Sequence, residues 1–219
     1  TITGGRTTGS GGGISSREDL TLANVTVAGN TAAAGDQSDS SNGGGGIYNG
    51  GGTLTVSDST VSGNTAASIF GIGGGIANFF GTLAVTGSTV SGNTAGFVGG
   101  GINNLGGTLA VTASTVSGNT ASGGGGIRNT SGGVATLTAS TVSDNTGGGV
   151  DNFSATLTVS ASTVSGNTTD GFGGGIVNVG SLAVTASTVS GNAAGTGGGV
   201  YNRAGAATVT ASTMSGNTA

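Results

Sequence analysis

Apolar residues alternate with small polar residues over short stretches along the whole chain. Leu54 and Val56 flank a threonine, and Val61 lies between a threonine and a serine. An alternation with a period of two predicts a short β-strand with one buried face. Glycine-rich segments separate these stretches and indicate turns. We therefore expect three short strands in this part of the chain, near Ile47, Leu54/Val56 and Val61.

Two motifs that end in asparagine recur along the chain about eight times. In the first, Gly-Gly-Gly-Ile-x-Asn, valine replaces isoleucine in two copies, and the first copy has Ser16 in place of the asparagine. Its asparagines are Asn49, Asn78, Asn104, Asn129, Asn152, Asn178 and Asn202. The second motif, Ser-Thr-Val-Ser-Gly-Asn, ends at Asn64, Asn93, Asn119, Asn145, Asn167, Asn192 and Asn217. Such self-similarity is the signature of a repeat architecture.

Only one part of each repeat varies in length. The apolar residue of the first motif and the valine position of the second are 13 to 15 residues apart in every copy. By contrast, the segment that leads to the next first motif ranges from 17 residues (Asn30 to Ile47) to 5 residues (Asn145 to Val150). We therefore predict a fixed frame with a loop of free length at one corner.

These patterns predict an all-β fold: a right-handed, single-stranded parallel β-helix, or β-solenoid, of about eight three-strand coils. A single domain would span residues 1–219. No stretch shows the 3.6-residue period of a helix, and a propeller blade would need roughly twice the residues of one repeat. Stacked coils would place Ile76 on Ile102, with rows of leucine and valine beside them. The asparagines would form structural ladders at the corners, each side chain hydrogen-bonding to its neighbours above and below.

The composition excludes several classes of protein. Glycine supplies 52 residues, yet proline is absent and no three-residue period exists, which excludes collagen. Cysteine and histidine are also absent, and the absence of cysteine excludes disulfides and thiolate metal sites. The four basic residues, all arginines, are scattered and form no patch that would bind nucleic acid. No apolar run is long enough for a membrane span. The low charge and the abundance of serine, threonine, asparagine and glycine favour a secreted or surface protein.

The two motifs in sequence, Gly-Gly-Gly-Ile-x-Asn and then Ser-Thr-Val-Ser-Gly-Asn-Thr-Ala, resemble the repeats of bacterial parallel β-helix surface proteins. They are similar to the polymorphic outer-membrane protein repeats of autotransporter-like adhesins. The resemblance covers essentially the whole chain and implies secretion and exposure on the cell surface. Because this fold hosts adhesins, lyases and ice-binding proteins alike, the resemblance is specific for fold and weak for function.

The acidic residues do not predict an enzyme. Asp144 and Asp151 flank the shortest corner, where surface acids in a turn are favoured over an active site. The segment 36–43 offers oxygen ligands, but its spacing matches neither the EF-hand loop nor the nonapeptide calcium repeat, so we favour a solvated loop. We predict no catalytic residue, no cofactor and no bound metal.

Threonine and serine on either side of each Val61-type valine should face solvent. They predict a flat array of two hydroxyl columns with a repeat of about 4.8 Å. Ice-binding solenoids use similar threonine arrays, so ice binding is one alternative function.

The two ends of the chain share one phase of the repeat. Thr1, Ile2 and Thr3 align with the Val61-type strand, and Met214 occupies the same strand near the C-terminus. The leading hypothesis is an extracellular structural protein that polymerises head to tail, with itself as partner. A fragment of a longer solenoid is the other interpretation of these ends. A further alternative is an adhesin that binds surface glycans through its loops, 32–46, 66–75 and 94–101.

Overall fold

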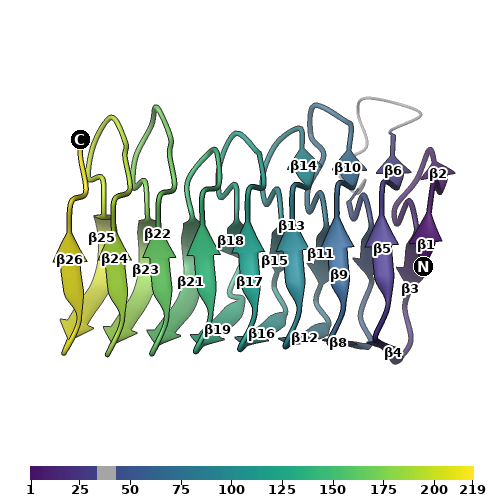
Figure 1. Cartoon of the computed structure of the whole chain (residues 1–219), viewed down its shortest axis with the longest axis horizontal. Helices are drawn as coiled ribbons and strands as arrows, with labels where there is room; N and C mark the ends of the chain where they lie inside the picture. The colour runs from purple at the N-terminus through teal and green to yellow at the C-terminus, as the bar shows by residue number, and fades with distance from the viewer. Residues whose placement is uncertain (34–42) are drawn as a thin grey trace.

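The structure is a computed structural model, and it describes residues 1–33 and 43–219. Within them the chain forms 26 strands, all paired in parallel, and no helix. Figure 1 shows one sheet running upward at the front and a second running downward behind it while the chain advances from right to left, which makes the solenoid right-handed. The predicted fold class is confirmed.

One sheet contains the strand of each second motif. Its nine strands are joined by eight coil-to-coil steps, so the stack rises roughly 40 Å. They are β1 (Ile2–Thr3), β5 (Thr26–Ala28), β9 (Thr60–Ser62), β13 (Thr89–Ser91), β17 (Thr115–Ser117), β20 (Thr141–Ser143), β22 (Thr163–Ser165), β24 (Thr188–Ser190) and β26 (Thr213–Ser215).

A 13-stranded sheet contains the first two strands of each coil. The strands of the first motif are β3 (Ile14–Ser16), β7 (Ile47–Asn49), β11 (Ile76–Phe79), β15 (Ile102–Leu105) and β18 (Ile127–Thr130). The strands that follow them are β4 (Leu20–Ala23), β8 (Thr53–Ser57), β12 (Thr82–Thr86), β16 (Thr108–Thr112) and β19 (Val134–Thr138). In the last three coils the two strands are continuous, as β21 (Val150–Ser160), β23 (Ile176–Thr185) and β25 (Val200–Thr210).

A further short strand, which the sequence analysis did not predict, follows each of β1, β5, β9 and β13. These strands, β2 (Arg6–Thr7), β6 (Thr31–Ala32), β10 (Thr65–Ala66) and β14 (Thr94–Ala95), form a four-stranded sheet. They lie at the start of the corner segments of variable length, where Figure 1 shows the loops gathered along one edge. Small side chains fill this corner, and Ala66, Ala95 and Ala121 form a separate buried cluster beneath it.

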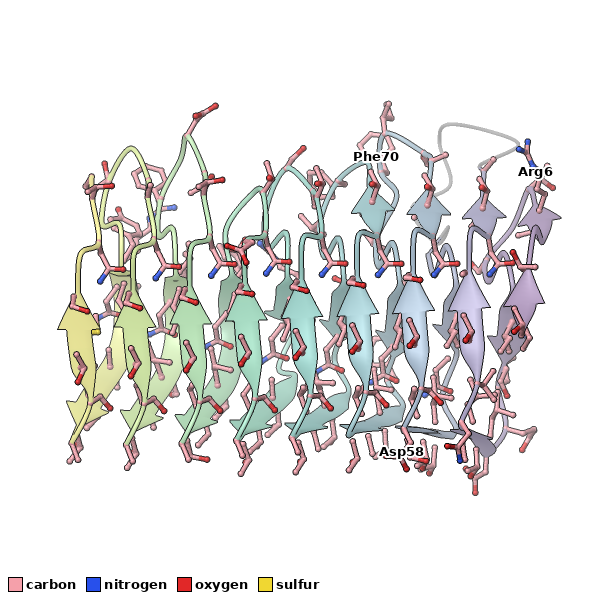
Figure 2. The ribbon with its side chains drawn as sticks, viewed as in Figure 1. Arg6, Asp58 and Phe70 are labelled. Atoms are coloured by element: carbon pink, nitrogen blue, oxygen red, sulfur yellow. The ribbon has the colours of Figure 1, made fainter. Side chains whose placement is uncertain are left out.

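The core consists of apolar rows that run along the solenoid axis. Ile76 pairs with Ile47 on one side and with Ile102 on the other, and all three are fully buried. The Leu54-type and Val61-type residues form equivalent rows. Burying one such side chain contributes about 1.5–3 kcal/mol, so the stability is spread over every coil. Figure 2 shows like side chains repeated from coil to coil.

Candidate functional site

The asparagines of the first motif form a continuous hydrogen-bonded ladder. From Asn49 to Asn178, each Nδ2 donates to the Oδ1 of the next asparagine at 2.7–3.0 Å, and the last acceptor is Asn202. In most coils the same Nδ2 also donates to the carbonyl three residues later, as from Asn78 to Gly81. The side chains from Asn49 to Asn178 are fully buried. The ladder therefore ties the corner that follows each first strand to the next coil.

The asparagines of the second motif form a second ladder, which begins one coil earlier than the motif itself, at Asn30. From Asn64 onward, each Oδ1 accepts both the backbone N–H and the Nδ2–H of the asparagine in the preceding coil, as Asn93 Oδ1 does from Asn64 at 3.0 Å. Asn93 Nδ2 in turn donates to the Val61 carbonyl and to Asn119 Oδ1. This ladder runs to Asn217 and satisfies backbone groups that the turn leaves unpaired.

A third ladder, of serines, was not recognised from the sequence. The first serine of the second motif is buried in every coil from Ser59 to Ser187. From Ser88 to Ser212, each Oγ accepts the backbone N–H of the equivalent serine in the preceding coil at 3.0–3.2 Å. Its hydroxyl donates to the carbonyl two residues earlier, as from Ser88 to Thr86. The serines are Ser59, Ser88, Ser114, Ser140, Ser162, Ser187 and Ser212. Their constancy in the motif was the signal that could have revealed them.

The first ladder is incomplete at its N-terminal end, which gives a stability prediction. Ser16 pairs with Asn49 but is too short to reach it, and Asn49 Oδ1 is buried without a partner. Ser16→Asn should supply that donor and raise the free energy of unfolding by about 1–2 kcal/mol. Urea unfolding would measure the change. The matched control is Ser15→Asn at the exposed neighbouring position, and an equal gain there would contradict the explanation.

The predicted assembly residues occupy the two terminal coils. Ile2 pairs with Val27 and packs against the core, with Thr1 and Thr3 exposed on either side of it. Met214 pairs with Val189 and is 44% exposed. Ile2 and Met214 therefore lie at opposite ends of one buried valine row.

The outer face of the nine-stranded sheet carries the two predicted hydroxyl columns. Thr89 lies in register with Thr60, and Ser91 with Ser62, and these side chains are partly exposed. The same pairs follow in β17, β20, β22, β24 and β26. Use of this array in ice binding stays a prediction.

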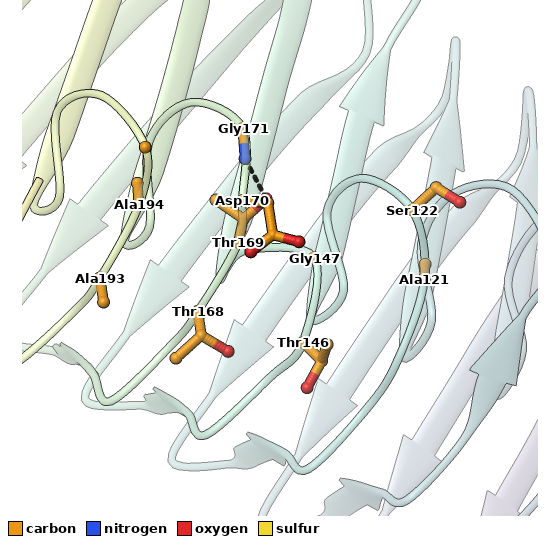
Figure 3. A pocket seen from close by; sticks show the side chains of 11 residues that line it. Ala121, Ser122, Thr146, Gly147, Thr168, Thr169, Asp170, Gly171, Ala193 and Ala194 are labelled. Carbon is orange, nitrogen blue, oxygen red and sulfur yellow. Dashed lines mark hydrogen bonds between the residues drawn. The ribbon is translucent and has the colours of Figure 1, made fainter.

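The shortest corner, residues 146–149, leaves a notch between longer loops. A hollow of about 680 Å³ opens there, lined by residues that include Ser122, Gly147, Thr169 and Asp170. Figure 3 shows Gly147 between Ser122 on one side and Thr169 with Asp170 on the other. The Gly171 N–H donates to Thr169 Oγ1 at 3.2 Å and closes the tip of that loop. The length variation read from the sequence thus produces a concave site.

A second hollow, of about 250 Å³, shares four lining residues with the first: Ser122, Gly147, Thr169 and Gly171. Other residues of its lining belong to β21, β23 and β25, and these include Phe153, Tyr201 and Arg203. Phe172, on the loop, stacks on the Tyr201 ring with 4.7 Å between centroids and 23° between planes. The two hollows form one groove, which we call the notch groove.

Of the two acids that flank the shortest corner, Asp151 borders the notch groove, where it forms an ion pair. Arg128 Nη1 donates to Asp151 Oδ2 at 2.8 Å, and the Arg128 guanidinium lies 5.0 Å from the Phe153 ring centroid. Burial raises the pKa of Asp151, although the Arg128 charge opposes that shift. Asp144 lies instead in the turn after β20, at a positive φ of 56°, where other coils have glycine. Its carboxylate is beside Gly166.

In the described part of the chain, no three acidic, histidine or cysteine side chains gather where they could hold a metal ion. Residues 36–42 of the predicted solvated loop lie outside the described residues. Among 1–33 and 43–219 there is also no helix long and apolar enough to cross a membrane.

Comparisons with known proteins give no relative. No protein-family model, curated protein or solved structure matches the chain. The resemblance of its repeats to bacterial surface proteins therefore stays a prediction.

Proposed function

We propose that this chain is an extracellular structural protein, a stiff rod that lengthens by stacking coil on coil. The observation that carries the proposal is the outer edge of the last coil. Val209 pairs with Val184 and Met214 with Val189, but Val209 and Met214 are 45% and 44% exposed whereas their partners are fully buried. The apolar rows and the unpaired strand edges of that coil match the surface that each interior coil offers to the next.

An edge of this kind accepts a further coil. In a preparation of residues 1–219, the only source of another coil is a second copy, whose first coil presents Ile2, Ile14 and Leu20 partly covered. Head-to-tail contacts of this type generate open filaments. The asparagine ladders would be interrupted at such a joint, because Gly5 and Ser16 occupy the asparagine positions of the first coil. A joint between copies would therefore be weaker than a joint between coils of one copy.

Electron microscopy of the purified chain tests the proposal. The wild-type protein should form filaments as its concentration rises, and Met214→Lys should prevent them, because a lysine at the end of the valine row would be buried unpaired at the joint. Thr213→Lys is the matched control, since Thr213 lies in the solvent-facing threonine column. Separate short rods at every concentration, or equal loss of filaments in both variants, would overturn the proposal.

A further inference from the structure

We propose that the notch groove binds an acidic oligosaccharide, with a sugar ring on the Phe172–Tyr201 pair and a carboxylate on Arg203. This site goes beyond the structural function and does not depend on filament formation. The rod would then have one defined saccharide-binding site. Four kinds of observation support it: the shape of the groove, its aromatic residues, its polar groups and its charge.

The shape suits an extended ligand. The lining of the two hollows includes Ser122, Gly147, Thr169 and Ala194, which belong to four successive coils. Three coil-to-coil steps correspond to roughly 14 Å along the solenoid axis. A groove of this length, open to solvent along its side, accommodates several linked sugar rings more readily than one small compact ligand.

The aromatic side chains are concentrated and accessible in the groove. Phe172 is 55% exposed although it stacks on Tyr201. Phe153, on β21, is 41% exposed. Exposed aromatic groups in a concave site with a polar rim are characteristic of ligand sites. The C–H face of a pyranose ring matches such a flat apolar surface, and the ring hydroxyls project toward the rim.

The rim supplies hydrogen-bonding groups for those hydroxyls. Ser122 and Thr169 line both hollows, together with the backbone of Gly147 and Gly171. These groups come from loops on the two sides of the notch, so a bound chain would bridge them. The coil between them leaves room because its corner consists of residues 146–149.

The charge of the groove selects an acidic ligand at one end. The whole chain has four basic residues, and two of them, Arg128 and Arg203, are at this site. The Asp151 carboxylate neutralises Arg128 at 2.8 Å, and in the described residues Arg203 has no ion-pair partner. Arg203 is therefore left to bind a carboxylate. Asp170 lines the larger hollow, where neutral hydroxyl-bearing rings fit better than a second acid group.

Calorimetric titration of the purified chain with two matched probes tests this inference. Cellohexaose is neutral, and its counterpart oxidised at C6 of one terminal ring carries a single carboxylate. We expect the oxidised hexamer to bind and the neutral hexamer to bind at least tenfold more weakly. Arg203→Gln and Phe172→Ala should each weaken binding of the oxidised hexamer about tenfold or more, since each removes one of the two proposed contacts.

Two control variants separate the site from general effects of charge and exposed aromatics. Arg6→Gln removes an arginine from the first coil, and Phe70→Ala removes a half-exposed phenylalanine from another corner loop, both outside the notch groove (Figure 2). Neither should change the affinity. Failure of the oxidised hexamer to bind, equal binding of both probes, or equal losses in the control variants would overturn the proposal. Filament formation by electron microscopy reports separately on the structural function.

Discussion

Replacing Asn119 by alanine should lower the free energy of unfolding by about 3–5 kcal/mol. Its Oδ1 accepts the Asn93 N–H and the Asn93 Nδ2–H, and its Nδ2 donates to the Val90 carbonyl and to Asn145 Oδ1. All of these groups are buried, so no water replaces the lost bonds. Because each coil contacts only its neighbours, an unstable middle coil should also split the rod into two halves that unfold separately. Urea unfolding would show a lower midpoint and a broader or two-step transition.

The matched control is Asn217→Ala at the end of the same ladder. Asn217 accepts from Asn192 and donates to the Val189 carbonyl, but it lies on the last coil and is only half-buried. Water can replace part of its bonding, so its loss should cost less than half as much. If the two variants lost equal stability, the ladder would not act through burial.

Gly100→Ala should destabilise the protein by more than about 3 kcal/mol or prevent folding. A Cβ at this position would lie 2.5 Å from the Gly125 carbonyl oxygen and 2.5 Å from the Thr120 carbonyl oxygen. Both atoms are backbone, and Gly125 belongs to the adjacent coil, so relief would require the coils to separate. Circular dichroism and urea unfolding of the purified variant would measure the loss.

Gly118→Asn is the contrasting variant, because this glycine is required for a different reason. Its φ is 62°, and the nearest atom to an added Cβ is 3.9 Å away. Asp144 holds the equivalent turn with a φ of 56°, which shows that a side chain fits there. Asparagine tolerates this conformation well, so the cost should be about 1 kcal/mol or less. A loss as large as that of Gly100→Ala would contradict the distinction between the two glycines.

The periodic part of the fold could be predicted because each coil repeats the same pattern of apolar, glycine and asparagine positions. The constant spacing from Ile76 to Val90 and from Ile102 to Val116 places like residues in register, and the structure pairs Ile76 with Ile102. The serine ladder was not predicted because a serine next to a strand can be either exposed to solvent or buried. Only the burial of Ser88 by the coils around it shows that its hydroxyl replaces a backbone partner.

The sequence by itself determined the solenoid, its rows of isoleucine, leucine and valine, and the corner at which the coils differ in length. These follow from a repeated pattern whose contacts lie between equivalent residues of neighbouring coils. The register of the repeats also places Arg128 beside Asp151, at equivalent positions of neighbouring coils. The tertiary structure alone decided the notch groove and the stacking of Phe172 on Tyr201. Phe172 and Tyr201 are non-equivalent residues of different coils, and their contact depends on how loops of unequal length pack beside the short corner. A periodic pattern carries no information about that packing.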